Sequence, residues 1–306
     1  QLLTGKNMHM PRPVASTTKM MTAILTMDYT GLNEIASVSP HADKTAEYTI
    51  GVRAGQTLPL QELMKAALIC SANDAAVVLA EHVAGDEALF AHLMSCKAFL
   101  IGATSTHFVN ASGLPADNHY STAYDLAQIG RYALTYPTIK ETVGTVQAEF
   151  HHPAYQKPIK IRNTNGLLNT YQGAEGIKTG TTDAAGKCLV AAATREGRQL
   201  IAVVLKSGDR QGDCWRLLDY GYTRFSYQKL INKNEPFKRI QVIGGKDNYT
   251  DVYPDEDVWL WVGERVPDIE KEVIMQYNIT APAPRGKKIG ELNVYAQGKL
   301  VKTIDL

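Results

Sequence analysis

Long hydrophobic runs are missing from this chain of 306 residues. A helix that crosses a bilayer needs about 18 consecutive apolar residues, whereas the longest runs here, such as residues 200–205, have the length of buried strands. Residues 1–5 carry neither the basic stretch nor the apolar segment of a signal peptide. We therefore expect a globular protein, and an exported one would have to be a processed or trimmed form.

A charge excess of either sign is also missing. Lysine and arginine number 32, aspartate and glutamate number 31, and the formal net charge is +1. Proteins that bind nucleic acids neutralise phosphates with a basic surface. The composition therefore predicts no nucleic-acid partner.

Cysteine is scarce, and the histidines form no metal motif. The chain has no C-x-x-C pair, which argues against a zinc or thioredoxin-type site. A disulfide framework is not expected in so long a chain with four cysteines, and we predict mostly buried thiols at Cys70, Cys96, Cys188 and Cys214. His151 and His152 are adjacent but lack the H-E-x-x-H pattern, so we predict an exposed loop there, no metal and no cofactor.

The hydrophobic pattern changes its period along the chain. Residues 1–15 are typical of a short strand and a loop. Apolar residues at helical spacing then predict helices from about Ser16 and over residues 60–69, 75–83, 87–101 and 122–135. Strand patterns follow at 176–181, 188–193 and 199–205, and a helix at 209–221. Helices followed by a strand meander indicate an α+β fold.

A second change occurs near residue 235. From residue 237 onward the chain is rich in β-branched and aromatic residues separated by turn residues, and segments 258–262 and 292–295 are typical strands. We predict a catalytic domain over residues 1–235 and a small all-β domain over residues 236–306.

Three short motifs occur in order: S-T-T-K at residues 16–19, S-A-N at residues 71–73 and K-T-G at residues 178–180. On a helix Ser16 and Lys19 share one face. A serine hydroxyl needs a nearby base to become a nucleophile. Neutral lysine can be that base if burial and a second positive charge, for which Lys178 is the candidate, lower its pKa from about 10.4.

The second motif suits proton transfer and orientation. Ser71 can relay a proton to a leaving amine. The Asn73 side chain both donates and accepts hydrogen bonds, so it can orient the lysine and the substrate amide. We predict Ser16, Lys19, Ser71 and Asn73 as the catalytic residues.

The third motif suits substrate binding at a strand edge. Lys178 and Thr179 can bind a terminal carboxylate, and Gly180 has no side chain where a substrate lies close to the backbone. The backbone N–H groups of Ser16 and Thr181 are candidates for an oxyanion hole. We predict residues 178–181 (Lys178, Thr179, Gly180 and Thr181) as the substrate-binding strand.

Two further matches are expected by chance. An S-x-x-K pattern recurs at Ser226 and Lys229, but no S-x-N follows it. The triplet at residues 206–208 has the form K-S-G, and it ends a strand as an ordinary turn would. A single match of either kind is weak, whereas the ordered triple on helix start, loop and strand is specific.

The ordered triple is the signature of penicillin-binding proteins and class A β-lactamases. The chain resembles the D-alanyl-D-alanine carboxypeptidases among the low-molecular-mass penicillin-binding proteins. The similarity extends to residues 106–110, 121–127, 163–168 and 176–182, and more loosely to the β-rich segment 281–294. The resemblance implies a serine β-lactamase/DD-peptidase-like domain, in which a helical cluster packs on an antiparallel sheet, followed by a small C-terminal all-β domain.

The same resemblance implies the function and the surroundings of the protein. The expected activity is removal of the terminal D-alanine from peptidoglycan stem peptides through an acyl-enzyme on Ser16, with β-lactam antibiotics acylating the same serine. The expected location is the extracytoplasmic cell envelope. Family members usually carry a strand upstream of the region that starts here at Gln1, and they often end in an amphipathic membrane-anchoring helix. From the resemblance we also expect secretion through a signal peptide before Gln1 and peripheral membrane association through a segment beyond Leu306.

Three alternatives stay open at this point. A class A β-lactamase would need a glutamate in an E-x-x-L-N pattern between the second and third motifs, and neither Glu141 nor Glu149 is followed by it. A non-catalytic peptidoglycan-binding protein would not need all three motifs. An endopeptidase that cuts cross-linked peptides would carry the same motifs, so the sequence does not distinguish it.

Overall fold

The computed structural model describes residues 1–263 and 268–306, and the chain divides into two compact units. One unit contains residues 6–219, and the other contains residues 1–5 together with 220–306. The predicted limits of 1–235 and 236–306 stay a prediction. Among the described residues, no helix is both long and apolar enough to span a bilayer.

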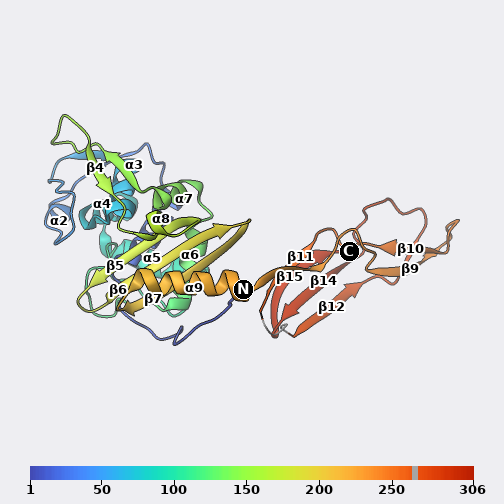
Figure 1. Ribbon diagram of the computed structural model, residues 1–306. Helices are drawn as coiled ribbons and strands as arrows, with labels where there is room; N and C mark the ends of the chain where they lie inside the picture. The colour runs from blue at the N-terminus through green and yellow to red at the C-terminus, as the bar shows by residue number, and fades with distance from the viewer. Residues whose placement is uncertain (264–267) are drawn as a thin grey trace. The chain divides into compact units, whose positions relative to one another are not determined.

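A three-stranded antiparallel sheet forms the centre of the first unit. Its order is β5 (Ala174–Thr182), β6 (Gly186–Arg195) and β7 (Arg198–Ser207). The middle strand is buried without interruption over residues 188–193, because helices cover both faces. Helix α9 (Arg210–Arg224) crosses the front of the sheet in Figure 1, and other helices are seen behind and above the sheet.

The helices behind the sheet form one cluster with a continuous apolar core. Its main members are α1 (Lys19–Tyr29), α4 (Asn73–Ala84), α5 (Glu87–Leu100) and α6 (Ala123–Ala133). Helix α6 approaches the sheet closely at Gly130, where an added Cβ would lie 2.9 Å from the Ile177 side chain. The helical cluster on an antiparallel sheet is therefore confirmed.

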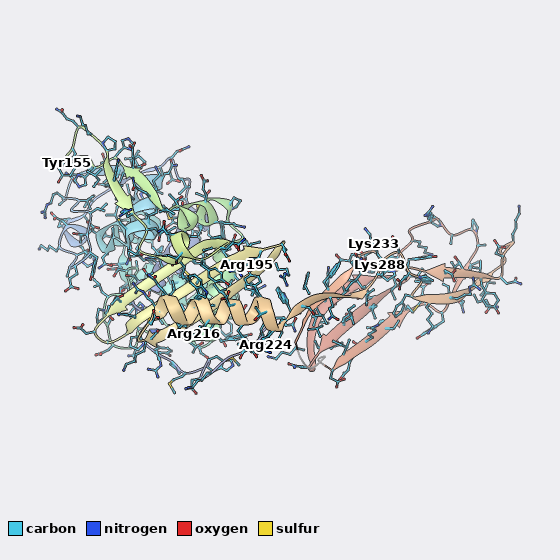
Figure 2. All side chains as sticks on the ribbon, viewed as in Figure 1. Tyr155, Arg195, Arg216, Arg224, Lys233 and Lys288 are labelled. Atoms are coloured by element: carbon cyan, nitrogen blue, oxygen red, sulfur yellow. The ribbon has the colours of Figure 1, made fainter. Side chains whose placement is uncertain are left out.

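The expected helices form, with irregular turns at the motifs. The predicted helix at Ser16 starts as a 3-10 turn, η1 (Ala15–Thr18), and the one over residues 60–69 splits into α3 (Leu60–Lys65) and a π-helical turn, η2 (Ala66–Cys70). Helix α9 does not end at Gly221 but continues to Arg224 (Figure 2). The strand expected within residues 1–15 is absent, apart from an isolated bridge between Arg12 and Ser121.

Several short elements have too weak a pattern to be recognised in the sequence. Two small antiparallel pairs flank the cluster: β1 (Ile35–Ser37) with β2 (Thr57–Pro59), and β3 (Gln147–Phe150) with β4 (Ile159–Arg162). Tyr155 lies at the outer end of the β3–β4 hairpin (Figure 2). The remaining helices are α2 (Pro40–Asp43), α7 (Pro137–Gly144) and α8 (Leu167–Thr170).

The second unit is built from strands around a small core of its own, which includes Val258, Leu292 and Val294. The predicted C-terminal all-β region is therefore confirmed, although its first strand begins at Ser226 rather than after residue 235. Its strands are β8 (Ser226–Ile231), β9 (Lys238–Ile243), β10 (Tyr249–Val252), β11 (Val258–Val262), β12 (Ile269–Met275), β13 (Asn278–Thr280), β14 (Gly290–Ala296) and β15 (Lys299–Asp305). They form the sheets β8-β11, β10-β9-β13 and β12-β14-β15.

Two predictions about polar side chains were only half right. Cys188 and Cys214 are buried, but Cys70 is partly exposed and Cys96 is exposed, because Cys96 lies on the outer side of α5. His151 is exposed as expected, whereas His152 is only 4% exposed, since its ring packs against Phe150 and Tyr155.

Candidate active site

Lys19 is the centre of the site. It is the first residue of α1 and is fully buried. Its Nζ lies 2.8 Å from Ser16 Oγ, 2.7 Å from Asn73 Oδ1 and 2.7 Å from the Ser112 carbonyl oxygen. A neutral amine has two N–H donors and one lone pair, and the Asn73 and Ser112 oxygens can only accept. Neutral Lys19 would therefore direct its lone pair at the Ser16 hydroxyl.

The surroundings of Lys19 favour this neutral form. Burial holds the pKa of Lys19 well below its ordinary value, and the charge of Lys178 lowers it further. Lys178 is itself buried, and burial lowers its pKa to about 7, with a smaller effect from Arg210. A desolvated amine near other cations is neutral, and thus able to accept a proton, in a larger fraction of molecules at neutral pH than an exposed lysine.

Two glycines allow other segments to touch the turn that carries Ser16. At Gly113 the backbone has φ +85°, and an added Cβ would lie 2.0 Å from the Ala15 carbonyl oxygen. At Gly180 an added Cβ would lie 2.7 Å from the Val14 carbonyl oxygen and 3.1 Å from the Ser16 nitrogen. A glycine is therefore needed at position 180 for packing against the nucleophile turn, in addition to the predicted close approach of substrate.

The second motif lies at the break between η2 and α4. Ser71 is 8% exposed and has φ +68°, which ends the π-helical turn. Asn73 begins α4, and its Nδ2 donates to the carbonyl oxygens of Ala46 (3.2 Å) and Glu47 (2.7 Å). Because Asn73 Oδ1 accepts from Lys19 while Nδ2 donates to these carbonyl oxygens, hydrogen bonds fix both the oxygen and the nitrogen of the side-chain amide.

The third motif lies in β5, an outer strand of the three-stranded sheet. Lys178 and Thr179 are 1% and 5% exposed, and Thr181 is exposed. The Thr179 hydroxyl lies 2.5 Å from the Thr164 hydroxyl, and the Thr164 N–H donates to the Ile69 carbonyl at 3.2 Å. Thr164 therefore ties the third motif to the turn that precedes the second.

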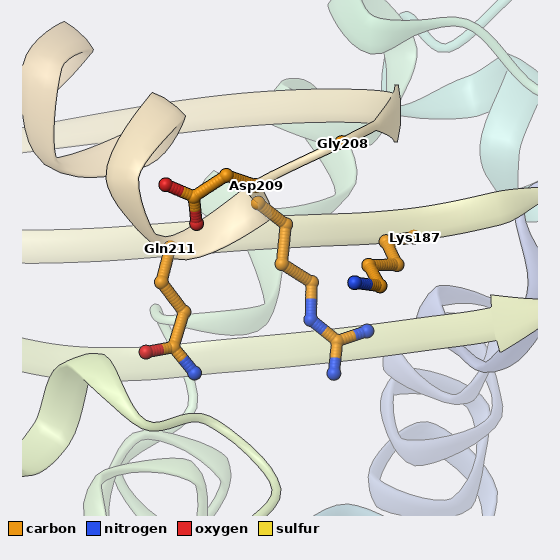
Figure 3. Close-up of a pocket in the computed structure, with 5 residues that line it drawn as sticks. Lys187, Gly208, Asp209 and Gln211 are labelled. Atoms are coloured by element: carbon orange, nitrogen blue, oxygen red, sulfur yellow. The ribbon is translucent and has the colours of Figure 1, made fainter.

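Arg210 joins the site although the sequence analysis missed it. Its Nη1 donates to the Gly180 carbonyl (3.0 Å) and to Thr181 Oγ1 (2.7 Å). A pocket of about 210 Å³ opens beside it, lined by Lys187, Gly208, Asp209, Arg210 and Gln211 (Figure 3). No local pattern marks Arg210, because it reaches β5 only once α9 has packed on the sheet.

The chance matches form no comparable site. Ser226 and Lys229 lie on β8, where residues three apart point to opposite faces, and Lys229 pairs with Asp257 at 2.7 Å. Lys206 is exposed at the end of β7. Across residues 1–263 and 268–306, no group of three His, Cys, Asp or Glu side chains is arranged to hold a metal ion.

Comparison with known proteins identifies the family. The model of the D-alanyl-D-alanine carboxypeptidase family, Peptidase_S11, matches residues 1–208, and that of the penicillin-binding protein 5 C-terminal domain matches residues 225–306. The chain belongs to the D-alanyl-D-alanine carboxypeptidase family. It is thus a serine peptidase of the D-Ala-D-Ala carboxypeptidase type, as the motifs predicted.

Individual relatives agree over nearly the whole chain. D-alanyl-D-alanine carboxypeptidase DacF of Bacillus subtilis is 30% identical over 311 residues, which cover 98% of this chain and 80% of that protein. Penicillin binding protein 5 from Haemophilus influenzae has a TM-score of 0.78 at 25% identity, covering 100% of this chain and 92% of the other. PBP3 from Streptococcus pneumoniae, described as a peptidoglycan synthesis regulatory factor, has a TM-score of 0.80 at 25% identity, covering 99% and 93%. The predicted DD-peptidase-like fold is confirmed.

Proposed function

We propose that this carboxypeptidase removes the terminal D-alanine of peptidoglycan stem peptides through an acyl-enzyme on Ser16, and that β-lactams acylate the same serine. The observation that carries the proposal is the contact of buried Lys19 with Ser16, Asn73 and Ser112. Lys19 is the general base that accepts the Ser16 proton as Oγ attacks the scissile carbonyl.

The tetrahedral intermediate forms where β5 lies against the nucleophile turn. Its oxyanion accepts hydrogen bonds from the backbone N–H groups of Ser16 and Thr181. The close packing of Gly180 on Ser16 supports this pairing, since it brings the two backbone segments together. Ser71 donates its hydroxyl proton to the leaving amine as the C–N bond breaks and takes the proton held by Lys19 in return, and D-alanine departs.

The substrate carboxylate binds at the cationic end of β5. Lys178 supplies positive charge, and Thr179 and Thr181 supply hydroxyl groups. Arg210 holds Thr181 and the Gly180 carbonyl with one nitrogen, and its guanidinium has further N–H groups for the carboxylate.

Hydrolysis of the acyl-enzyme is assigned to Lys19 and Ser71 rather than to a glutamate. Glu141 and Glu149 are exposed, and Glu175 is engaged by Lys140, Thr194 and Gln199. Lys19, together with Ser71, activates the water. A peptide acyl-enzyme clears because its leaving group has diffused away, whereas the tethered amine of an opened β-lactam obstructs water.

Fluorescent penicillin labelling tests the nucleophile. We expect Ser16→Ala to abolish the covalent adduct and Ser226→Ala to leave it intact, as measured by intact-mass spectrometry and peptide mapping. An adduct on Ser226, or none on the wild-type protein, would contradict the proposal, and the latter would favour a non-catalytic peptidoglycan-binding protein. Turnover of D-Ala-D-Ala peptides beside cross-linked muropeptides separates carboxypeptidase from endopeptidase activity.

The family acts on peptidoglycan peptides that end in D-Ala-D-Ala, and its penicillin-binding members bind β-lactams. This implies an extracytoplasmic location. Secretion by a signal peptide and peripheral attachment to the membrane stay predictions.

A further inference from the structure

The segment over residues 107–121 is fastened to the nucleophile turn and α1 at several points. The Ser112 carbonyl accepts from Lys19 Nζ at 2.7 Å, and the Ala111 carbonyl accepts from the Thr22 hydroxyl at 2.6 Å. Gly113 packs on the Ala15 carbonyl. One of the three partners of the proposed base is therefore a backbone atom of this segment, so the position of the segment decides how Lys19 is held.

A buried side-chain pair fastens the other end of the segment. His119 Nε2 lies 2.8 Å from Thr18 Oγ1, and the two residues are 6% and 0% exposed. The Val109 N–H donates to His119 Nδ1 at 3.2 Å. Because Nδ1 accepts, the ring proton is on Nε2, which donates to the Thr18 hydroxyl.

The surroundings keep this ring neutral. Phe108 packs edge-on against it at 5.6 Å between ring centroids. Burial lowers the pKa of His119 to about 4, with a smaller contribution from His107. Neutral His119 thus bridges Val109, inside the segment, to Thr18, the residue directly before Lys19.

We propose that His119 is a positioning residue for acylation, which acts through Thr18 and the Ser112 carbonyl to hold Lys19 against Ser16. This inference rests on the proposed roles of Ser16 and Lys19. Without the bridge, residues 107–121 can move away from α1, and the contact between Lys19 Nζ and the Ser112 carbonyl oxygen is weakened. Water then reaches the amine, and its protonated form becomes easier to populate.

Thr18→Val and Thr18→Ser form the sharpest pair of variants. Valine matches the shape of threonine but cannot accept the proton of His119 Nε2, whereas serine can. His119→Asn tests the other end, because its Oδ1 can replace Nδ1 as acceptor from Val109 while the side chain is too short to reach Thr18. His152→Asn is the matched control, since His152 is equally buried and its Nδ1 accepts a backbone N–H from Ala154 at 3.1 Å.

The measurements are the acylation rate constant and the dissociation constant of the preceding complex with a chromogenic β-lactam, from pH 5 to 10. We expect Thr18→Val and His119→Asn to lower the acylation rate constant about 10-fold, in keeping with the cost of small misplacements in active sites. The dissociation constant should stay unchanged, because neither residue touches the ligand. The acid limb of the rate profile should move to higher pH. Thr18→Ser and His152→Asn should keep both the wild-type rate and the wild-type limb.

The outcomes separate this inference from the proposed function. Wild-type rates and an unshifted acid limb in folded Thr18→Val would overturn the role of His119. Equal rate losses in His152→Asn would also overturn it, by showing a general effect of stability. A wild-type protein that is not acylated on Ser16 would instead contradict the proposed function. In the double variant Thr18→Val/His119→Asn the losses should not multiply, because both changes break one bridge.

Discussion

The buried amine of Lys178 should lower the stability of the folded protein, so that replacing Lys178 with an uncharged side chain of similar size stabilises it. Lys178 is 1% exposed, and burial lowers its pKa from 10.5 to about 7. That gap corresponds to about 5 kcal/mol, which is an upper limit because variants can relax and admit water. We expect Lys178→Met to raise the free energy of unfolding at pH 7 by about 1–4 kcal/mol, while binding of the substrate carboxylate is lost.

The pH dependence gives this prediction its sign. Because the folded pKa lies below the unfolded one, the unfolded chain binds more protons between about pH 7 and 10.5, and stability rises with pH in that window. The amount by which Lys178 lowers the free energy of unfolding is therefore close to its maximum at pH 7 and decreases toward zero at pH 10.5. Lys178→Met should remove this part of the slope.

Denaturant unfolding from pH 6 to 10 measures the effect. The chain has three tryptophans, so a Trp259→Phe/Trp261→Phe background leaves Trp215 in α9 as the reporter of the first unit. Lys206→Met is the control, because Lys206 is exposed. A Lys178→Met variant that is less stable than wild type at pH 7, or one with the wild-type pH slope, would refute the reasoning.

Four further predictions concern the site, the domains and the acyl-enzyme. Lys19→Met should lower penicillin acylation by about 10²–10⁴-fold with unchanged circular dichroism, since a missing general base has this effect; wild-type rates would exclude the role. Gly180→Ala should lower stability by about 1–3 kcal/mol through overpacking and slow acylation, whereas Gly31→Ala, whose added Cβ meets no atom closer than 3.5 Å, should change neither in melting and labelling assays. A chain that ends at Arg224 should still be labelled by penicillin, and a folded but inert fragment would show that the β-rich unit shapes the site. Finally, a penicilloyl adduct followed by mass spectrometry should persist through many turnovers of a D-Ala-D-Ala peptide, and clearance within seconds would make the enzyme a β-lactamase in practice.

The sequence by itself was sufficient to recognise the three motifs, the family and the long helices and strands. The residues of each motif are neighbours in the chain, so Ser16 with Lys19, and Lys178 with Thr179, could be recognised from spacing and residue type. Helical periodicity located α4 and α5, and the strand pattern located β6 and β7, because long elements repeat their pattern often enough to be read. Short pairs such as β1 and β2 have three residues each and do not.

Only the tertiary structure decided what surrounds the motifs. Arg210, Thr164 and His119 reach the site across 30, 15 and 101 residues from their partners Gly180, Thr179 and Thr18. Their contacts depend on how α9, the 163–166 turn and the 107–121 segment pack, which no local pattern encodes. The lowered pKa of Lys19 has the same origin, because burial and the charge of Lys178 exist only once the sheet and the helices have come together. Residue type supplies the candidate reacting groups, whereas desolvation and fixed distances, which arise from packing, lower the pKa of Lys19 and place it beside Ser16.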